Sequence, residues 1–202
     1  SHQEVEDSMM LWDPIRFLEA CPSSDGACAM IIANKDLVSK SPKPPAWILG
    51  GAMRSEPTIY AGRDEVNPRA GRDCAKDVYA QAGISDPRRQ FDCAEIYVPF
   101  SWYEPMWLEN LGFADQGEGW RLTLDGATSL DEGGDIPWNC SGGVLSSNPI
   151  GASGMIRFAE AARQVRGDAD QHQVENARLA LGHAYGGGAQ FFSMWVVGAN
   201  KP

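Results

Sequence analysis

The chain has 202 residues, of which 43% are hydrophobic and 22% charged, and its formal net charge is −10 at pH 7. This length can bury an apolar core, so we expect one compact unit. The negative charge excludes the usual nucleic-acid-binding surface, which neutralises phosphates with Lys and Arg. No apolar run reaches the roughly twenty residues of a membrane span, and we expect no membrane partner.

Five cysteines are spread along the chain without a Cys-x-x-Cys pair. This usage is typical of free thiols in a reducing compartment and indicates neither disulfides nor a metal site. The amino-terminal residues SHQEVEDSMMLW are acidic and lack the basic and apolar regions of a secretory signal. We therefore expect a cytoplasmic protein without a bound metal.

The hydrophobic pattern predicts alternating strands and helices. Aliphatic residues at 26–34 and 46–53 predict two paired strands, separated by the Pro-rich break at 40–47. A helix is expected from Pro68 to a stop at Gly83. The later elements are expected in this order: a strand at 91–102 halted by Pro99, a helix at 103–113, an irregular excursion at 114–139 that could serve as a lid, a helix from Pro149 to about Val165 closed by Gly167, and strands at 177–183 and 189–197 around a glycine turn. This alternation indicates an α/β fold with a mixed sheet covered by helices.

The turn CSGGVLSSNPIGASG, at 140–154, leads into a helix whose first turn is nearly free of side chains. Its unpaired amides and the positive end of the helix dipole could face an oxyanion or the polar end of a ligand. Small residues would equally let the helix pack tightly on a strand, and both interpretations stay open.

Two further turns carry candidate functional groups. In HAYGGGAQ, the glycines 186–188 exceed what a hairpin turn needs, so a ligand or another backbone segment is expected to pass close to Tyr185. In AEIYVPFSW, Tyr97 precedes the break at Pro99, where a lone tyrosine is usually part of the core.

Several segments together resemble, in chain order, the carboxyl-terminal half of the thiolase superfamily. They are PSSDGACAMIIA, DVYAQAGISDPRRQFDCAEIYVPF, WLENLGF, SGGVLSSNPIGASGMIRFAEAARQVRG and YGGGAQFFSMWVV. The similarity is greatest to the sterol-carrier-type thiolases and the lipid-transfer-protein-like steroid side-chain aldolases. It implies that residues 1–202 form one half of the layered αβαβα thiolase fold, and that the amino-terminal half, with the family's nucleophilic cysteine, is absent from this chain.

The family's catalytic positions hold different residues here. The histidine of the Gly-His-Pro motif falls on Asn148, the cysteine before the glycine run falls on or near Ala184, and the His or Asn of the third active-site segment falls on Tyr97. An amide has no titratable group with which to take a proton. The resemblance therefore implies that ordinary thiolysis is lost.

The chemistry that remains is the stabilisation of an enolate. Asn148 and the helix-end amides near Gly151 could donate hydrogen bonds to a thioester oxygen. The resemblance implies retro-aldol cleavage of a β-hydroxyacyl-CoA, which in the steroid-aldolase branch releases a ketosteroid and propionyl-CoA. The proton acceptor is expected to be Tyr185, with Tyr97 as the alternative and His183 as a weaker candidate, because a phenol needs help to ionise at neutral pH. The expected substrate-binding residues are Gly151, Ser153, Gly186, Gly187 and Trp102.

Partners follow from the same resemblance. A thiolase half would expose an apolar face, so we expect the amino-terminal half, a homodimer and a partner with an oligonucleotide-binding-type barrel. No cofactor is expected beyond the coenzyme A of the substrate. Two other functions stay open: a thiolase-type acyltransferase acting on β-ketoacyl-CoA, and a non-catalytic lipid-binding or scaffolding module.

Overall fold

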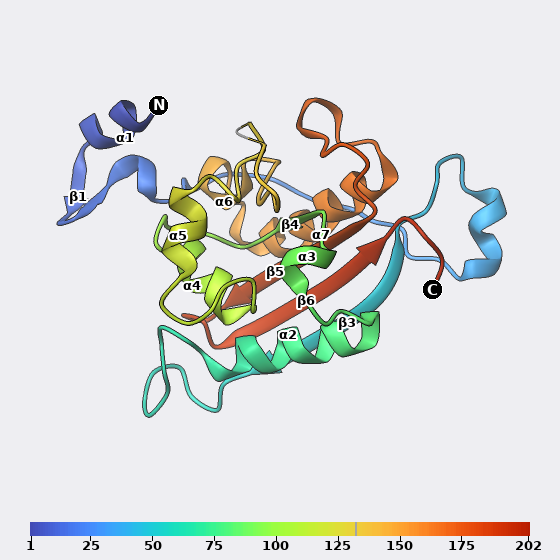
Figure 1. The fold of residues 1–202 in the computed structure, drawn as a ribbon, viewed down its shortest axis with the longest axis horizontal. Coiled ribbons are helices and arrows are strands. Elements are labelled where there is room, and N and C mark those ends of the chain that lie inside the picture. Colours follow the sequence, from blue (N-terminus) through green and yellow to red (C-terminus); the bar gives the residue numbers. More distant parts are fainter. Residues whose placement is uncertain (132) are drawn as a thin grey trace.

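A four-stranded mixed sheet forms the centre of the computed structural model, which describes residues 1–131 and 133–202 (Figure 1). The sheet has the order β3-β6-β5-β4, with β4 parallel to β5 and the other pairs antiparallel. Its strands are β3 (Trp47–Ser55), β4 (Cys93–Glu95), β5 (Leu179–Gly186) and β6 (Phe191–Gly198). The expected mixed sheet is confirmed.

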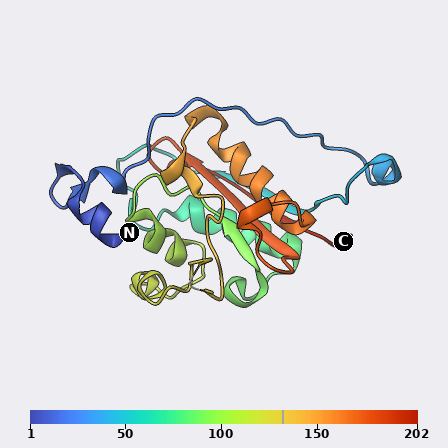
Figure 2. The same cartoon turned by 90° about the horizontal axis from the view of Figure 1, so that it is seen from above.

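Helices cover both faces of the sheet (Figure 2). Helix α7 packs on β5 and β4 on one face, while α2 packs on β3 and β6 on the other. The helices are α1 (His2–Asp7), α2 (Arg69–Ala82), α3 (Pro87–Gln90), α4 (Tyr103–Asn110), α5 (Gly119–Leu124), α6 (Gly143–Ser146) and α7 (Ile150–Arg166). A small hairpin of β1 (Met10–Trp12) and β2 (Ile15–Arg16) lies near the amino terminus, to one side of the sheet. Among the described residues, no helix is both long and apolar enough to cross a membrane.

The predicted helix ends are confirmed where glycine stops them. Helix α2 ends at Gly83 with φ of 71°, and α7 ends at Gly167 with φ of 72°. Glycine adopts this left-handed conformation without the steric cost that a Cβ imposes. The closing hairpin of β5 and β6 is confirmed as well, with strands shifted by one to three residues.

The predicted strand at 26–34 is wrong. These residues form no strand, and Ile31 and Ile32 are 96% and 73% exposed. They belong to an extended segment that runs past α7, and β3 pairs with β6 instead (Figure 2). A short aliphatic run fits a strand by composition alone, but it does not specify which partner is free to pair.

The predicted strand at 91–102 is much shorter in the structure, because side chains take over its backbone hydrogen bonds. Asn139 Oδ1 accepts the Ile96 N–H at 2.8 Å, and His183 Nδ1 accepts the Tyr97 N–H at 3.3 Å. The excursion at 114–139 contains the short helix α5 and otherwise turns or bends, and Trp138 forms a bridge to Ala94. Residue 132 of this stretch lies outside the described residues.

Glycine allows α7 to pack closely on the sheet. A Cβ added to Gly154 would lie 2.8 Å from the Cβ of Ala184, well inside contact distance. No described atom lies within 4 Å of a Cβ added to Gly151 in the same helix. The small residues of this turn therefore serve close packing at Gly154, while the backbone at Gly151 is open.

We expect Gly154→Ala to be less stable than Gly151→Ala by about 1–3 kcal/mol, because only the first substitution overpacks the contact with Ala184. Both replacements gain a similar helix propensity, so Gly151→Ala is the matched control. Urea-induced unfolding of the two variants measures the difference. Equal unfolding midpoints would show that α7 can shift away from β5 without cost.

Candidate active site

Asn148 lies at the centre of a hydrogen-bonded cluster immediately before α7. Its side chain is buried, and its Oδ1 accepts hydrogen bonds from the Tyr97 hydroxyl at 3.0 Å and the Ser153 hydroxyl at 2.7 Å. Its Nδ2 donates to the sulfur of Cys21 at 3.2 Å, and its backbone N–H donates to Ser24 Oγ at 3.2 Å. The orientation of the amide is therefore set on both sides, with the oxygen toward two hydroxyls and the nitrogen toward a thiol.

Tyr97 connects Asn148 with Tyr185, so three of the four predicted catalytic residues lie together. The Tyr97 and Tyr185 rings meet edge to face with centroids 5.2 Å apart, and Tyr185 stacks on Tyr103 at 5.4 Å. Burial raises the pKa of Tyr97 above its ordinary value, and it raises the pKa of Tyr185 much further. Both side chains are therefore neutral phenols near pH 7.

His183 lies beneath this cluster and is closed to solvent. Its exposed fraction is 0%, its Nδ1 accepts the Tyr97 backbone N–H, and its Nε2 has no partner among the described residues. Burial lowers the pKa of His183 to about 3, so the ring stays neutral. His183 can therefore support the Tyr97 backbone, but a ring that is closed to solvent cannot exchange protons directly with a substrate.

A buried ion pair holds the elements that carry the site. Arg157 of α7 donates to Glu95 at the end of β4 at 2.5 Å, and the two side chains are 4% and 1% exposed. The Ser141 hydroxyl joins them, donating to Glu95 at 2.8 Å and accepting from Arg157 at 2.9 Å. Burial raises the pKa of Glu95, while the charge of Arg157 opposes that rise. The network ties β4, the turn before α6 and α7 into one frame.

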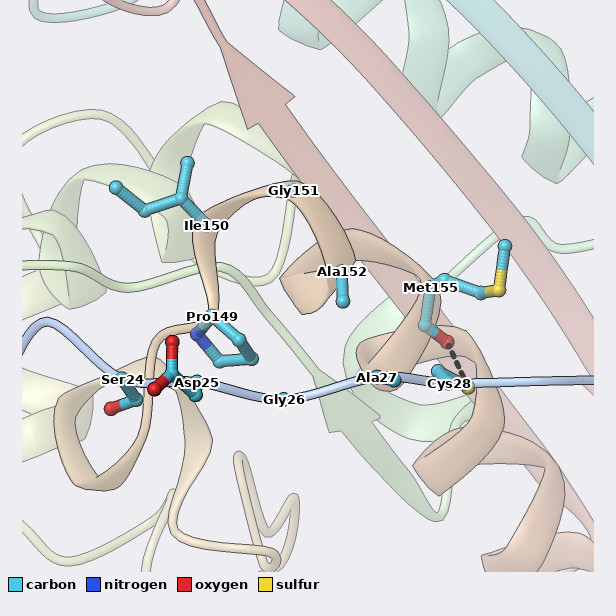
Figure 3. Close-up of a pocket in the computed structure, with 10 residues that line it drawn as sticks. All are labelled: Ser24, Asp25, Gly26, Ala27, Cys28, Pro149, Ile150, Gly151, Ala152 and Met155. Carbon is cyan, nitrogen blue, oxygen red and sulfur yellow. Dashed lines mark hydrogen bonds between the residues drawn. The ribbon is translucent and has the colours of Figure 1, made fainter.

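The predicted substrate-binding residues near Asn148 differ in their accessibility. Gly151 is exposed and lines an open groove of about 560 Å³ between the segment 24–28 and the start of α7 (Figure 3). Ser153 is only 1% exposed, and its hydroxyl donates a hydrogen bond to Asn148 Oδ1. Ser153 thus positions the amide, whereas the backbone at Gly151 stays open to a ligand.

The other predicted substrate-binding residues lie outside the Asn148 cluster. Gly186 ends β5, and Gly187 lies in the turn with φ of 62°. The side chain of Arg63 reaches this turn and donates to the Ala189 carbonyl at 2.6 Å. Trp102 stacks on Phe100 with centroids 4.6 Å apart and lines a separate groove beside α5.

Cys21 and Ser24 were not predicted as site residues, although PSSDG is part of the resemblance. The expected strand at 26–34 placed this region in the sheet, whereas it lies along the start of α7. A Cβ on Gly26 would lie 2.7 Å from Pro149 Cγ, so glycine is needed for the close approach. The available signal was Gly26, which follows Cys21 and Ser24 closely. A glycine indicates a close approach, but it does not reveal that this segment crosses the turn before α7.

Comparisons with known proteins identify the family. The family described as "Thiolase C-terminal domain-like" matches residues 51–199. The chain belongs to this thiolase family. It is 34% identical to an acetyl-CoA acetyltransferase of Methanothermobacter thermautotrophicus, over 92% of this chain and 48% of that protein. It is 32% identical to sterol carrier protein 2 of Homo sapiens, over 98% of this chain and 37% of that protein.

A solved structure supports the thiolase-like fold over the full chain. The "Ltp2-ChsH2(DUF35) aldolase" superposes with a TM-score of 0.84 at 26% identity, covering 100% of this chain and 52% of that one. The thiolase chain thus spans about half the length, or less, of the relatives that it matches. The chain is therefore a thiolase-like domain related to acyl-CoA chemistry.

We expect the stability of the protein to decrease as the pH is lowered, in a way that depends on His183. Between the pKa of about 3 in the folded state and the ordinary value of about 6.5, the unfolded chain binds one more proton than the folded chain. The contribution of His183 to the free energy of unfolding is thus fully present above about pH 6.5. Below that pH, this contribution decreases by up to about 1.4 kcal/mol per pH unit.

The substitution His183→Asn keeps a hydrogen-bond acceptor for Tyr97 and removes the titration. Urea unfolding between about pH 4 and pH 6.5 should show a shallower pH dependence in this variant. His2→Asn, at the exposed amino terminus, is the control and should keep the parent's slope. Parallel curves for the parent and His183→Asn would contradict the assignment.

Proposed function

We propose that this thiolase chain is part of an aldolase that cleaves a carbon–carbon bond in a β-hydroxyacyl-CoA. The observation that carries the proposal is the Asn148 amide, whose orientation is fixed by its hydrogen bonds. The family resemblance places a histidine at this position. An amide can donate a hydrogen bond to a thioester oxygen, but it cannot accept a proton at neutral pH. Enolate stabilisation is thus retained, while the general-base step of thiolysis is lost.

The proposed reaction needs no sulfur nucleophile. A base removes the proton of the β-hydroxyl, the bond between the α- and β-carbons breaks, and its electron pair forms the enolate of the thioester. Asn148 Nδ2 stabilises the charge that develops on the thioester oxygen, and protonation of the α-carbon completes the shorter acyl-CoA. The products are a ketone and a saturated acyl-CoA.

The likeness to an aldolase structure supports carbon–carbon cleavage, and on the family resemblance we propose a ketosteroid and propionyl-CoA as the products. Tyr97 and Tyr185 supply aromatic surface on which a fused apolar ring system could pack. We propose the predicted partners on the same basis. These are an amino-terminal thiolase half, a second copy of the protein and a barrel protein. The first is supported by the chain's coverage of about half of a relative, and the third by the aldolase structure, whose name joins two components. The second copy rests on the family resemblance alone. The free state of all five cysteines, which lie within the described residues, fits a cytoplasmic location.

A thiolase-type acyltransferase is the second candidate, because one of the relatives is an acetyl-CoA acetyltransferase. In that case the amino-terminal half would have to supply the missing proton transfer. The two reactions give different products, since an acyltransferase converts a β-ketoacyl-CoA and free coenzyme A into two acyl-CoA molecules.

We expect Asn148→Ala to lower kcat/KM for ketone release by about 100-fold to 1,000-fold, the usual effect of removing one oxyanion donor. The assay uses the complete protein with its amino-terminal half and barrel partner, a steroid β-hydroxyacyl-CoA, and detection of ketone and propionyl-CoA. Asn200→Ala removes an exposed amide and should act like the parent. An unchanged kcat/KM in Asn148→Ala would exclude the proposed role. Conversion of a β-ketoacyl-CoA and free coenzyme A into two acyl-CoA molecules, without release of a ketone, would favour the acyltransferase.

A further inference from the structure

The hydroxyl protons next to Asn148 are directed to an atom that cannot pass them on. Tyr97 and Ser153 both donate to Asn148 Oδ1. A neutral amide oxygen accepts hydrogen bonds but holds no proton near pH 7. Neither hydroxyl therefore has an outlet for its own proton through Asn148, so neither can take a second proton from a substrate.

Tyr185 is poorly suited to hold a negative charge. Burial raises its pKa far above that of an ordinary phenol, and a hydrogen bond with Tyr103 raises it further. The largest contributions to that pKa, from burial, Tyr103, Tyr97 and Cys21, all raise it. The phenolate of Tyr185 is thus costly to form, although its ring packs directly on Tyr97.

The remaining acidic group of the cluster is the thiol of Cys21. Its sulfur accepts a hydrogen bond from Asn148 Nδ2 at 3.2 Å. A negative charge on Cys21 contributes to raising the pKa of both Tyr97 and Tyr185, so the thiol lies within electrostatic reach of both rings. Thiols in general also ionise closer to neutrality than phenols.

The backbone holds Cys21 firmly in this position. Its N–H donates to the Pro99 carbonyl at 2.8 Å, and the adjacent Ala20 forms a bridge with Phe100. Ser24, three residues further along the chain, accepts the Asn148 backbone N–H at 3.2 Å. Cys21 is half-buried, so its sulfur lies in the protein frame without being closed off completely.

We propose that Cys21 carries the proton in the cleavage reaction, an assignment that rests on the proposed function. Its thiolate takes the proton of the β-hydroxyl as the carbonyl forms and the bond between the α- and β-carbons breaks. The electron pair enters the thioester enolate, and the Cys21 thiol then returns the proton to the α-carbon. The thiolate is regenerated, no bond to sulfur forms, and no further reactant is consumed. Asn148 Nδ2 has two hydrogens, so it can serve Cys21 and the thioester oxygen together.

The test uses Cys21→Ala and Cys21→Ser in the complete protein with its amino-terminal half and barrel partner. We measure ketone release, and separately the exchange of the α-protons of propionyl-CoA in D₂O by NMR. Both rates should fall about 100-fold to 10,000-fold in Cys21→Ala, the usual contribution of a general base. Cys21→Ser keeps the size and a hydrogen-bonding atom, and it should lose a similar factor, with any residual activity rising only at higher pH. Cys140→Ala, which removes a thiol whose pKa burial raises to about 12, should exchange α-protons at the parent's rate.

The outcomes separate this assignment from the proposed function. If the parent releases ketone and Cys21→Ala does so equally fast, Cys21 is not the proton carrier, while the aldolase stands. If the parent releases no ketone, the aldolase proposal fails, and alkylation then tests the thiol on its own. Propionyl-CoA should slow the alkylation of Cys21 relative to Cys140, as measured by mass spectrometry of the modified peptides. Unprotected Cys21 would overturn the assignment.

Discussion

The buried ion pair of Glu95 and Arg157 is the interaction on which the arrangement of the site depends. Both groups are removed from water, so each is tolerated only because the other is present, and leaving one alone costs about 3–5 kcal/mol. Glu95 lies two residues before Tyr97, and Arg157 lies in the helix that begins directly after Asn148 and Pro149. The pair thus fixes the relative position of the two segments whose side chains meet at the Asn148 amide.

The early end of β4 is what releases Tyr97 from the sheet. Side chains of Asn139 and His183 accept the backbone N–H groups of Ile96 and Tyr97, in place of a neighbouring strand. The chain can then turn out of the sheet without leaving these donors unpaired. His183 must be neutral to accept the Tyr97 N–H, because a protonated ring has no acceptor nitrogen. The burial that lowers the pKa of His183 therefore also supports the site.

The sequence predicted those features that depend on local patterns. Glycine stops, helical periodicity and the final hairpin are set by residues within a few positions of one another, and these were found. The family pattern predicted that Asn148, Tyr97 and Tyr185 share one site, and these three side chains do lie next to one another in the structure. The partner of β3 and the path of residues 21–34 depend on contacts between distant segments. For that reason the strand at 26–34 was wrong, and Cys21 and Ser24 were missed.

In the proposed reaction, an amide at Asn148, where the family resemblance places a titratable histidine, separates two tasks that a single imidazole can combine. An amide has the same charge at every accessible pH, so its hydrogen bond to a developing oxyanion does not depend on protonation. Its orientation is not symmetric either, because two hydroxyls occupy its oxygen and leave the nitrogen as the donor. Proton transfer must then come from a neighbour that can change its charge, and the neighbour on the donor side of the amide is the Cys21 sulfur. In such a site the pH dependence of the reaction reports on the proton carrier alone, while the stabilisation of the enolate stays constant.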